Sequence, residues 1–298
     1  MTPPFISIVL PTYNRAALIG ETIHSICSQT YQNWELLVID DGSDDDTESV
    51  VKKIGDKRIR FYSGGRTGNI IHLRLKGMTL AAGELIAFMD SDDLWAPEKL
   101  QKQVNALVAF PDAGFSLTGG YNFTERDQPL AFFYPQKTGV RYGQVLEAFF
   151  RSEVAMIFPT LVFRSQCMDK FRATETCVFN SDVDFLIALA HYFPAVVLYE
   201  PLLFRRLHTS NNSSEDWEKG FAEKIVVIAE SRSKKIISSS LSREALFKLY
   251  INFGEKYLQR KQQKKAVGKF WKAWQNRPFS VIPLKKTGKA FLSFFRYK

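Results

Sequence analysis

Four short apolar runs in the first hundred residues, each followed by a helix-like or polar segment, limit the folds open to this chain more than any other feature. The runs are "ISIVL" (6–10), "ELLVI" (35–39), "IRFY" (59–62) and "ELIAFM" (84–89). Because they lack polar alternation, they predict strands covered on both faces, as in a parallel sheet. Helical patterns lie between them at 16–28, 45–54 and 73–82. This alternation predicts a doubly wound α/β fold.

The rest of the chain continues the pattern and then changes. We predict that Ser43 or Asp44 caps the helix at 45–54. A later helix is predicted to begin at Pro97. Further elements are expected at 113–120 (strand), 143–151 (helix), 160–164 (strand), 182–193 (helix) and 195–200 (strand). From about residue 215 the pattern is helical. We therefore expect a domain at 1–215, with halves at about 1–120 and 121–215, and a helical region at 216–298.

Polar and acidic segments follow three of the predicted strands. They are "PTYNR", "DDGSDDD" and "DSDD". The carboxyl ends of parallel strands meet at one edge of a sheet, where ligands bind in folds of this type. The three segments therefore predict one site.

The segment "DSDD" brings three carboxylates within four positions. If it is extended, Asp90 and Asp92 lie on one side and Asp93 on the other. Two carboxylates so placed suit a hard divalent ion, Mg²⁺ or Mn²⁺, which favours phosphate oxygens as further ligands. We expect no metal contact from Asp93. An acidic surface turn without a ligand is the alternative.

The segment "IDDGS" ends the second predicted strand. Gly42 permits a tight turn, and Ser43 can cap the helix that follows. These roles leave Asp40 and Asp41 unexplained. A carboxylate at this position could accept hydrogen bonds from a nucleobase N–H or a ribose hydroxyl.

Charge is distributed unevenly along the chain. The net charge is +9, but residues 219–298 hold 20 lysines and arginines against 4 acidic residues. An acidic body therefore carries a basic C-terminal region, which points to an anionic partner for that region. No secretory signal, membrane-spanning run or metal-type cysteine spacing is recognisable, so we expect a cytoplasmic protein.

The basic region contains the stretch "KKAVGKFWKAWQNRP" (264–278). Its apolar residues recur at helical spacing among lysines, which suits the anionic face of a membrane. A helical hairpin packed on the rest of the protein explains the same pattern, and both alternatives stay open. No nucleic-acid-binding motif supports nucleic acid as the partner.

The acidic segments, taken in order, resemble family 2 glycosyltransferases of the GT-A fold. The resemblance rests on "SIVLPTYNR", "LLVIDDGSDDDT", "AAGELIAFMDSDDLWAPEKL", "NSDVDFLIALA" and "PLLFRRLH", and covers about residues 5–212. It implies a Rossmann-like, mostly parallel sheet flanked by helices, followed here by the basic helical extension. Where the family usually has "ARN", this chain has "LRL" (73–75).

The resemblance also implies roles for individual residues. Asp182 corresponds to the general base, with Asp184 as an open alternative. Asp92 and His208 would bind the metal. The nucleotide sugar would contact Pro11, Thr12, Tyr13, Asp40, Asp41, Arg74, Asp90, Ser91 and Arg206.

The activity implied is transfer of a sugar, with inversion, from a nucleoside-diphosphate donor to a hydroxyl acceptor. We expect a UDP-sugar donor, a glycan or lipid-linked glycan acceptor, and a role in cell-surface polysaccharide or glycolipid synthesis. A non-catalytic nucleotide-sugar-binding protein is the alternative from another class. A sugar-phosphate nucleotidyltransferase is disfavoured because "PTYNRA" lacks a glycine-rich phosphate loop.

Overall fold

The structure is a computed structural model and describes all residues except 1, 125–128, 135–136, 174–180, 208–216 and 288–298. The chain divides into two compact units. The first comprises Met1–Val145 and Ala155–His208, and the second comprises Leu146–Val154 and Thr209–Lys298. Each unit is described by itself.

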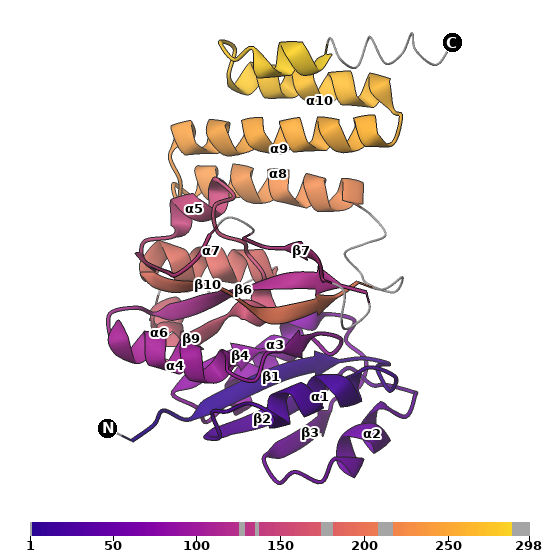
Figure 1. The fold of residues 1–298 in the computed structure, drawn as a ribbon, viewed down its shortest axis with the longest axis vertical. Coiled ribbons are helices and arrows are strands. Elements are labelled where there is room, and N and C mark those ends of the chain that lie inside the picture. The colour runs from indigo at the N-terminus through magenta and orange to yellow at the C-terminus, as the bar shows by residue number, and fades with distance from the viewer. Residues whose placement is uncertain (1, 125–128, 135–136, 174–180, 208–216, 288–298) are drawn as a thin grey trace. The chain divides into compact units, whose positions relative to one another are not determined.

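A mixed sheet forms the centre of the first unit (Figure 1). Its order is β3-β2-β1-β4-β9-β6-β10-β5, with β7 beside β6 and β8 beside β10. The strands are β1 (Ile6–Thr12), β2 (Trp34–Asp40), β3 (Ile59–Ser63), β4 (Leu85–Phe88), β5 (Leu94–Trp95), β6 (Phe115–Phe123), β7 (Pro129–Phe132), β8 (Val140–Gly143), β9 (Val162–Arg164) and β10 (Ala195–Arg206). Strands β1 to β4 are parallel, whereas β9 is antiparallel to both neighbours. The carboxyl ends of β1, β2 and β4 therefore share one edge.

Helices cover both faces of this sheet. They are α1 (Ile19–Cys27), α2 (Thr47–Lys53), α3 (Ile70–Leu80), α4 (Lys99–Ala109), α6 (Cys167–Ala173) and α7 (Asp182–Tyr192). On one face, Ile23 of α1 and Leu100 of α4 belong to the same core cluster as Ile8. On the other face, Phe88 contacts Phe185 of α7 with 6.2 Å between ring centroids. The predicted α/β class, with a central sheet between helices, is confirmed.

Helix α3 lies directly against β1. A Cβ built on Gly77 would come within 2.3 Å of Val9 Cγ1, so only glycine allows the observed approach.

The main differences from prediction lie at element ends and in short strands. Helix α2 begins at Thr47, and neither Ser43 nor Asp44 caps it, because Ser43 Oγ donates to Asp40 Oδ1 instead. Pro97 lies in the turn before α4 rather than at its first position. Strands β5, β7 and β8 were not predicted, because two to four residues give too little periodicity to recognise.

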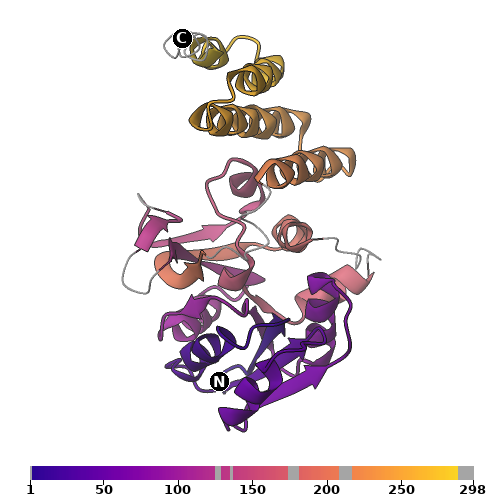
Figure 2. The same cartoon turned by 90° about the vertical axis from the view of Figure 1, so that its right-hand side faces the viewer.

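The second unit is helical, as predicted for the C-terminal region. It contains α5 (Leu146–Phe150), α8 (Trp217–Ser233), α9 (Ser239–Gln259) and α10 (Gln263–Asn276). Helix α9 packs against both α8 and α10, and Figure 2 shows these three helices in successive layers.

The apolar face of α10 is buried against α9. Phe270 has no exposed surface, and its ring would contact a Cβ built on Gly254 of α9. Trp271, the next residue, is 56% exposed and stacks on Trp274, with 5.0 Å between ring centroids. Part of the apolar face of α10 that the sequence suggested for membrane binding is therefore buried against α9. No helix in the described ranges has the length and apolar character to cross a membrane.

Candidate active site

The loops that follow β1 and β2 are tied together by hydrogen bonds. Asn14 adopts a positive φ of 48°, and its N–H donates to Ser43 Oγ at 2.9 Å. The N–H of Ala16 donates to Asp45 Oδ2 at 2.9 Å. These bonds hold the "PTYNR" and "DDGSDDD" segments at the same edge of the sheet, as the sequence predicted.

Pro11 and Thr12 are the last two residues of β1, and both are buried. The hydroxyl Oγ1 of Thr12 has no hydrogen-bond partner among the described residues. Because buried hydroxyl groups are nearly always bonded, this oxygen is suited to a polar group of a ligand.

Asp40 stabilises its own turn. Its Oδ2 accepts the N–H groups of Gly42 at 3.0 Å and Ser43 at 2.9 Å, and its Oδ1 accepts the Ser43 hydroxyl at 2.5 Å. Gly42 has a φ of +75°, a conformation that glycine adopts without strain. The turn so fixed presents the next residue, Asp41, at the sheet edge.

Asp41 is buried, and both of its carboxylate oxygens are bonded. Oδ1 accepts from Thr67 N at 2.7 Å and Thr67 Oγ1 at 2.6 Å. Oδ2 accepts from Gly68 N at 2.9 Å and Arg66 Nη1 at 2.9 Å. Arg66 also lies over Tyr13, with its guanidinium carbon 3.4 Å from the ring centroid. The two residues predicted to receive the nucleobase are thus brought together, and Arg66 contacts both.

The "DSDD" segment forms a turn rather than an extended strand. The N–H of Asp93 donates to the carbonyl oxygen of Asp90 at 3.3 Å. The predicted alternation of side chains is therefore wrong, because the chain turns soon after β4 ends. Asp93 is buried and accepts the backbone N–H of Arg206 at 3.0 Å. Burial, together with the neighbouring carboxylates of Asp90 and Asp92, raises the pKa of Asp93.

Two arginines lie beside Asp92. The Nε of Arg206 donates to the Asp92 carbonyl oxygen at 3.0 Å, and its Nη2 pairs with Glu21 at 2.9 Å. The Nη2 of Arg15 is 4.0 Å from Asp92 Oδ2. Arg206, which the family resemblance assigned to the nucleotide sugar, therefore contacts the acidic turn directly.

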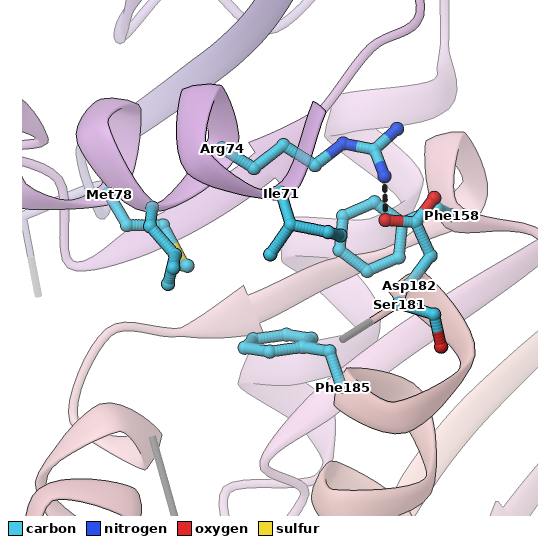
Figure 3. Close-up of a pocket in the computed structure, with 8 residues that line it drawn as sticks. Ile71, Arg74, Met78, Phe158, Ser181, Asp182 and Phe185 are labelled. Atoms are coloured by element: carbon cyan, nitrogen blue, oxygen red, sulfur yellow. Dashed lines mark ion pairs between the residues drawn. The ribbon is translucent and has the colours of Figure 1, made fainter. Parts of the chain in front are cut away.

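Arg74 connects the acidic turn to α7. It is 2% exposed, its Nη2 donates to Asp90 Oδ1 at 2.6 Å, and its Nη1 forms an ion pair with Asp182 Oδ1. Figure 3 shows this ion pair and the side chains around it. The guanidinium carbon lies 4.3 Å from the ring centroid of Phe158. Burial lowers the pKa of Arg74, and the charge of Asp90 opposes that shift.

Asp182 is the first residue of α7. Ser181 is the N-cap, and its side chain accepts the N–H of Asp184. Ser181 and Asp182 also line a small pocket that includes Met78 and Phe185 (Figure 3). A helix N-terminus attracts negative charge, and Arg74 brings a positive charge to the same carboxylate.

The remaining predicted residues are placed as follows. Ser91 lies buried in the acidic turn. His208 lies outside the described residues.

Sequence reasoning missed two arginines of the site, Arg15 and Arg66. Arg15 ends the quoted motif "PTYNR", so its position was a usable signal. Arg66 lies in the glycine-rich segment "GGRTG", where no periodic pattern marks a side chain for attention.

The acidic turn suits a divalent ion that is shared with a ligand. No group of three or more histidine, cysteine or acidic side chains in the described ranges could hold a metal by itself. Mg²⁺ is commonly bound through one or two carboxylates and completed by substrate phosphates. Asp92 matches that mode, and Asp90 offers a second carboxylate at the same turn.

Known proteins share the fold and parts of the sequence. WfgD of Escherichia coli, a UDP-Glc:alpha-D-GlcNAc-diphosphoundecaprenol beta-1,3-glucosyltransferase, is 34% identical over 143 residues, covering 48% of this chain and 55% of WfgD. The structure of S. aureus TarS 1-349 with UDP-GlcNAc aligns with a TM-score of 0.63 at 18% identity, covering 90% of this chain and 81% of TarS 1-349. The mannosyltransferase PcManGT of Pyrobaculum calidifontis, in complex with GDP-Man and Mn²⁺, aligns with a TM-score of 0.59 at 19% identity, covering 98% and 81% of the two chains.

The two structural neighbours establish the fold, which is GT-A as the sequence implied. The model of glycosyl transferase family 2 matches residues 7–168, more than half of the chain. That span contains the tied loops after β1 and β2, Arg74 and the acidic turn. The chain therefore belongs to glycosyl transferase family 2.

Proposed function

We propose that this protein transfers a sugar, with inversion, from a UDP-sugar to a hydroxyl group of a glycan or lipid-linked glycan. Asp182 acts as the general base. It accepts the proton of the acceptor hydroxyl as that hydroxyl forms its bond to the anomeric carbon and the bond to the diphosphate breaks. A single base opposite the leaving group gives inversion at that carbon.

The observation that carries the proposal is the contact of Arg74 with both Asp90 and Asp182. It joins the acidic turn, where a diphosphate and cation are expected, to the carboxylate assigned as base. These residues are far apart in sequence and come from different elements, so their meeting supports a single reaction site.

The donor is recognised at the ends of β1 and β2. Tyr13 offers an aromatic face, Asp41 an acceptor for a nucleobase N–H, and Thr12 an unbonded hydroxyl. Asp40 supports these groups through its turn, and Pro11 and Ser91 complete the lining. The name of WfgD specifies UDP-Glc, and the TarS structure is a complex with UDP-GlcNAc. Both support uridine as the nucleoside.

A divalent ion, Mg²⁺ or Mn²⁺, would be held by Asp92 and His208, with Asp90 contacting the ribose and metal-bound water. When bound, the ion would stabilise negative charge on the departing diphosphate. Arg206, beside the acidic turn, adds positive charge for the same leaving group. The PcManGT complex with Mn²⁺ supports this assignment.

The acceptor half is residues 121–215, and residues 216–298 form a separate basic region. WfgD acts on a diphosphoundecaprenol-linked sugar, which supports a lipid-linked acceptor and a role in cell-surface polysaccharide synthesis. We place the protein in the cytoplasm, at the inner face of the cell membrane, where residues 256–298 meet anionic lipid.

Asp182→Asn and Asp184→Asn form the matched pair that tests the base. The Asp182 change removes the proton acceptor, so turnover with a UDP-sugar and Mn²⁺ is expected to fall about 10²- to 10⁴-fold. Asp184→Asn is expected to keep most of the turnover. UDP binding by calorimetry should survive both changes. Full turnover by Asp182→Asn would remove the base assignment, and turnover that is indifferent to EDTA would remove the metal.

A further inference from the structure

We propose that Arg66 occupies the nucleobase position in the donor-free protein and is exchanged for the base when the donor binds. The inference rests on the proposed function, because it assumes that Tyr13 and Asp41 receive the base. It makes Arg66 a residue that sets donor affinity and base selectivity.

The guanidinium of Arg66 makes the two contacts expected of a nucleobase. It lies over Tyr13 at 3.4 Å from the ring centroid and donates to Asp41 Oδ2 at 2.9 Å. A guanidinium is planar, carries N–H donors in its plane and stacks on aromatic rings, and a nucleobase shares these properties. At van der Waals distance from the ring, Arg66 leaves no space for a base between them.

Two donors to Asp41, Arg66 Nη1 and Thr67 Oγ1, are side-chain groups that can leave without moving the backbone, and of these two Arg66 also covers the ring of Tyr13. Thr67 and Gly68 donate through their main-chain N–H groups, whereas Arg66 donates through a side chain that is 52% exposed. Gly65 and Gly68 have φ values of +76° and +66°, which fix the segment in turns that favour glycine. Rotation of the Arg66 side chain would therefore expose one acceptor position on Oδ2 and the face of Tyr13.

A single acceptor position favours a base that presents a single ring N–H. Uracil presents a single hydrogen-bond donor, N3–H, on its pairing edge. Guanine presents N1–H and an amino group together and would need both carboxylate oxygens, but Thr67 already donates twice to Oδ1. The exchange with Arg66 therefore selects a uracil nucleotide over a guanine nucleotide.

The test compares UDP binding by isothermal titration calorimetry in the wild type, Arg66→Ala and Arg66→Lys. Removing the competing side chain is expected to tighten UDP about threefold to tenfold in Arg66→Ala. Arg66→Lys keeps the charge but loses the planar group, so its Kd should lie between the other two. GDP should bind the wild type more weakly than UDP.

Arg58→Ala is the matched control, because Arg58 also lies over an aromatic ring, Trp34 at 3.6 Å, and pairs with a carboxylate, Asp56 at 2.6 Å. It should leave UDP binding unchanged. Inorganic pyrophosphate, which has charge but no base, should compete with UDP equally well in the wild type and in Arg66→Ala.

The outcomes separate the inference from the proposed function. The exchange would be overturned if Arg66→Ala bound UDP no more tightly than the wild type, or if it also lost affinity for pyrophosphate. In either case the protein would still bind a nucleotide, and the proposed function would stand. GDP binding as tight as UDP binding would overturn the selectivity. If neither the wild type nor any variant binds a nucleotide, the proposed function itself fails, and the inference with it.

Discussion

Arg74 shows how one buried side chain organises this site. Its guanidinium has two carboxylate partners, Asp90 and Asp182, in different elements. A buried charge is tolerated only when it is paired, and removing one partner of a buried pair is strongly destabilising. Arg74 therefore positions the proposed base as well as the acidic turn.

Asp41 allows a pH test of its hydrogen bonds. Burial alone would raise the pKa of its carboxyl, but hydrogen bonds from Thr67 and Gly68 and the charge of Arg66 lower it below the ordinary value of 3.8. The ionised form is thus favoured by folding. The resulting stability is fully present above pH 3.8 and is lost as the pH falls through the lower folded-state pKa.

We expect Asp41→Asn to unfold at a lower temperature than the wild type at pH 6, since its NH2 group, itself a donor, replaces a carboxylate oxygen that accepts two hydrogen bonds. The difference in Tm should narrow as the pH falls below about 4. Thermal unfolding followed by circular dichroism between pH 3 and 6 measures this. A constant difference across that range would contradict the lowered pKa.

Residue types at strand ends were predictable, whereas their partners were not. The positions of Asp40, Asp41, Asp90 and Asp92 followed from the rule that parallel strands end at one edge. That Asp41 is bonded by a loop some 25 residues later required the structure. The backbone of the acidic turn was misread because four polar residues after a strand look the same in extended and turned conformations.

At the scale of elements, the contact between α3 and β1 places the most specific constraint on the sequence, because it requires glycine at position 77. Gly77 permits that contact, and α3 in turn holds Arg74 at the site. The long buried strands and helices were predictable because their apolar pattern is repeated over many residues. Pairing partners such as β9 between β4 and β6 were not, since the order of strands in a sheet depends on packing across the whole unit.

Gly77→Ala and Gly20→Ala form a matched pair of helix substitutions. At Gly77 the new methyl would meet Val9 at 2.3 Å, so we expect a loss of about 1–3 kcal/mol in the free energy of unfolding. At Gly20 on α1 the nearest atom is 3.5 Å away, and alanine's helix propensity should stabilise the protein by up to about 1 kcal/mol. Urea unfolding measures both, and equal effects would contradict the close approach.

At the scale of the whole molecule, two units of different character share one chain. The first holds the sheet and the site, and the second is helical and basic. The helical nature of residues 216–298 was predictable from pattern. The buried residues of α10 were not predictable, because Phe270 and Trp271 are adjacent aromatic residues and one is buried while the other is largely exposed.

This difference guides the test of membrane binding. Deleting 256–298 would remove α10 and with it Phe270 from the core of the second unit, so a surface substitution is preferable. We expect Trp271→Ser to weaken sedimentation with anionic phosphatidylglycerol vesicles several-fold while leaving Tm nearly unchanged, because Trp271 is largely exposed. The control is vesicles of neutral phosphatidylcholine, and unchanged sedimentation with anionic vesicles would contradict this role for Trp271.

The bond between Asp93 and the backbone N–H of Arg206 spans 113 residues of sequence. A ribosome adding about 5–20 residues per second needs roughly 6–23 s to make that stretch. During this interval β5 has no β10 to pair with, and the carboxyl of Asp93 has no backbone N–H to accept. The turn proposed to meet the cation is therefore completed only after β10 has been made, so a polypeptide released earlier would contain the first strands but lack the finished edge at which the donor is proposed to bind.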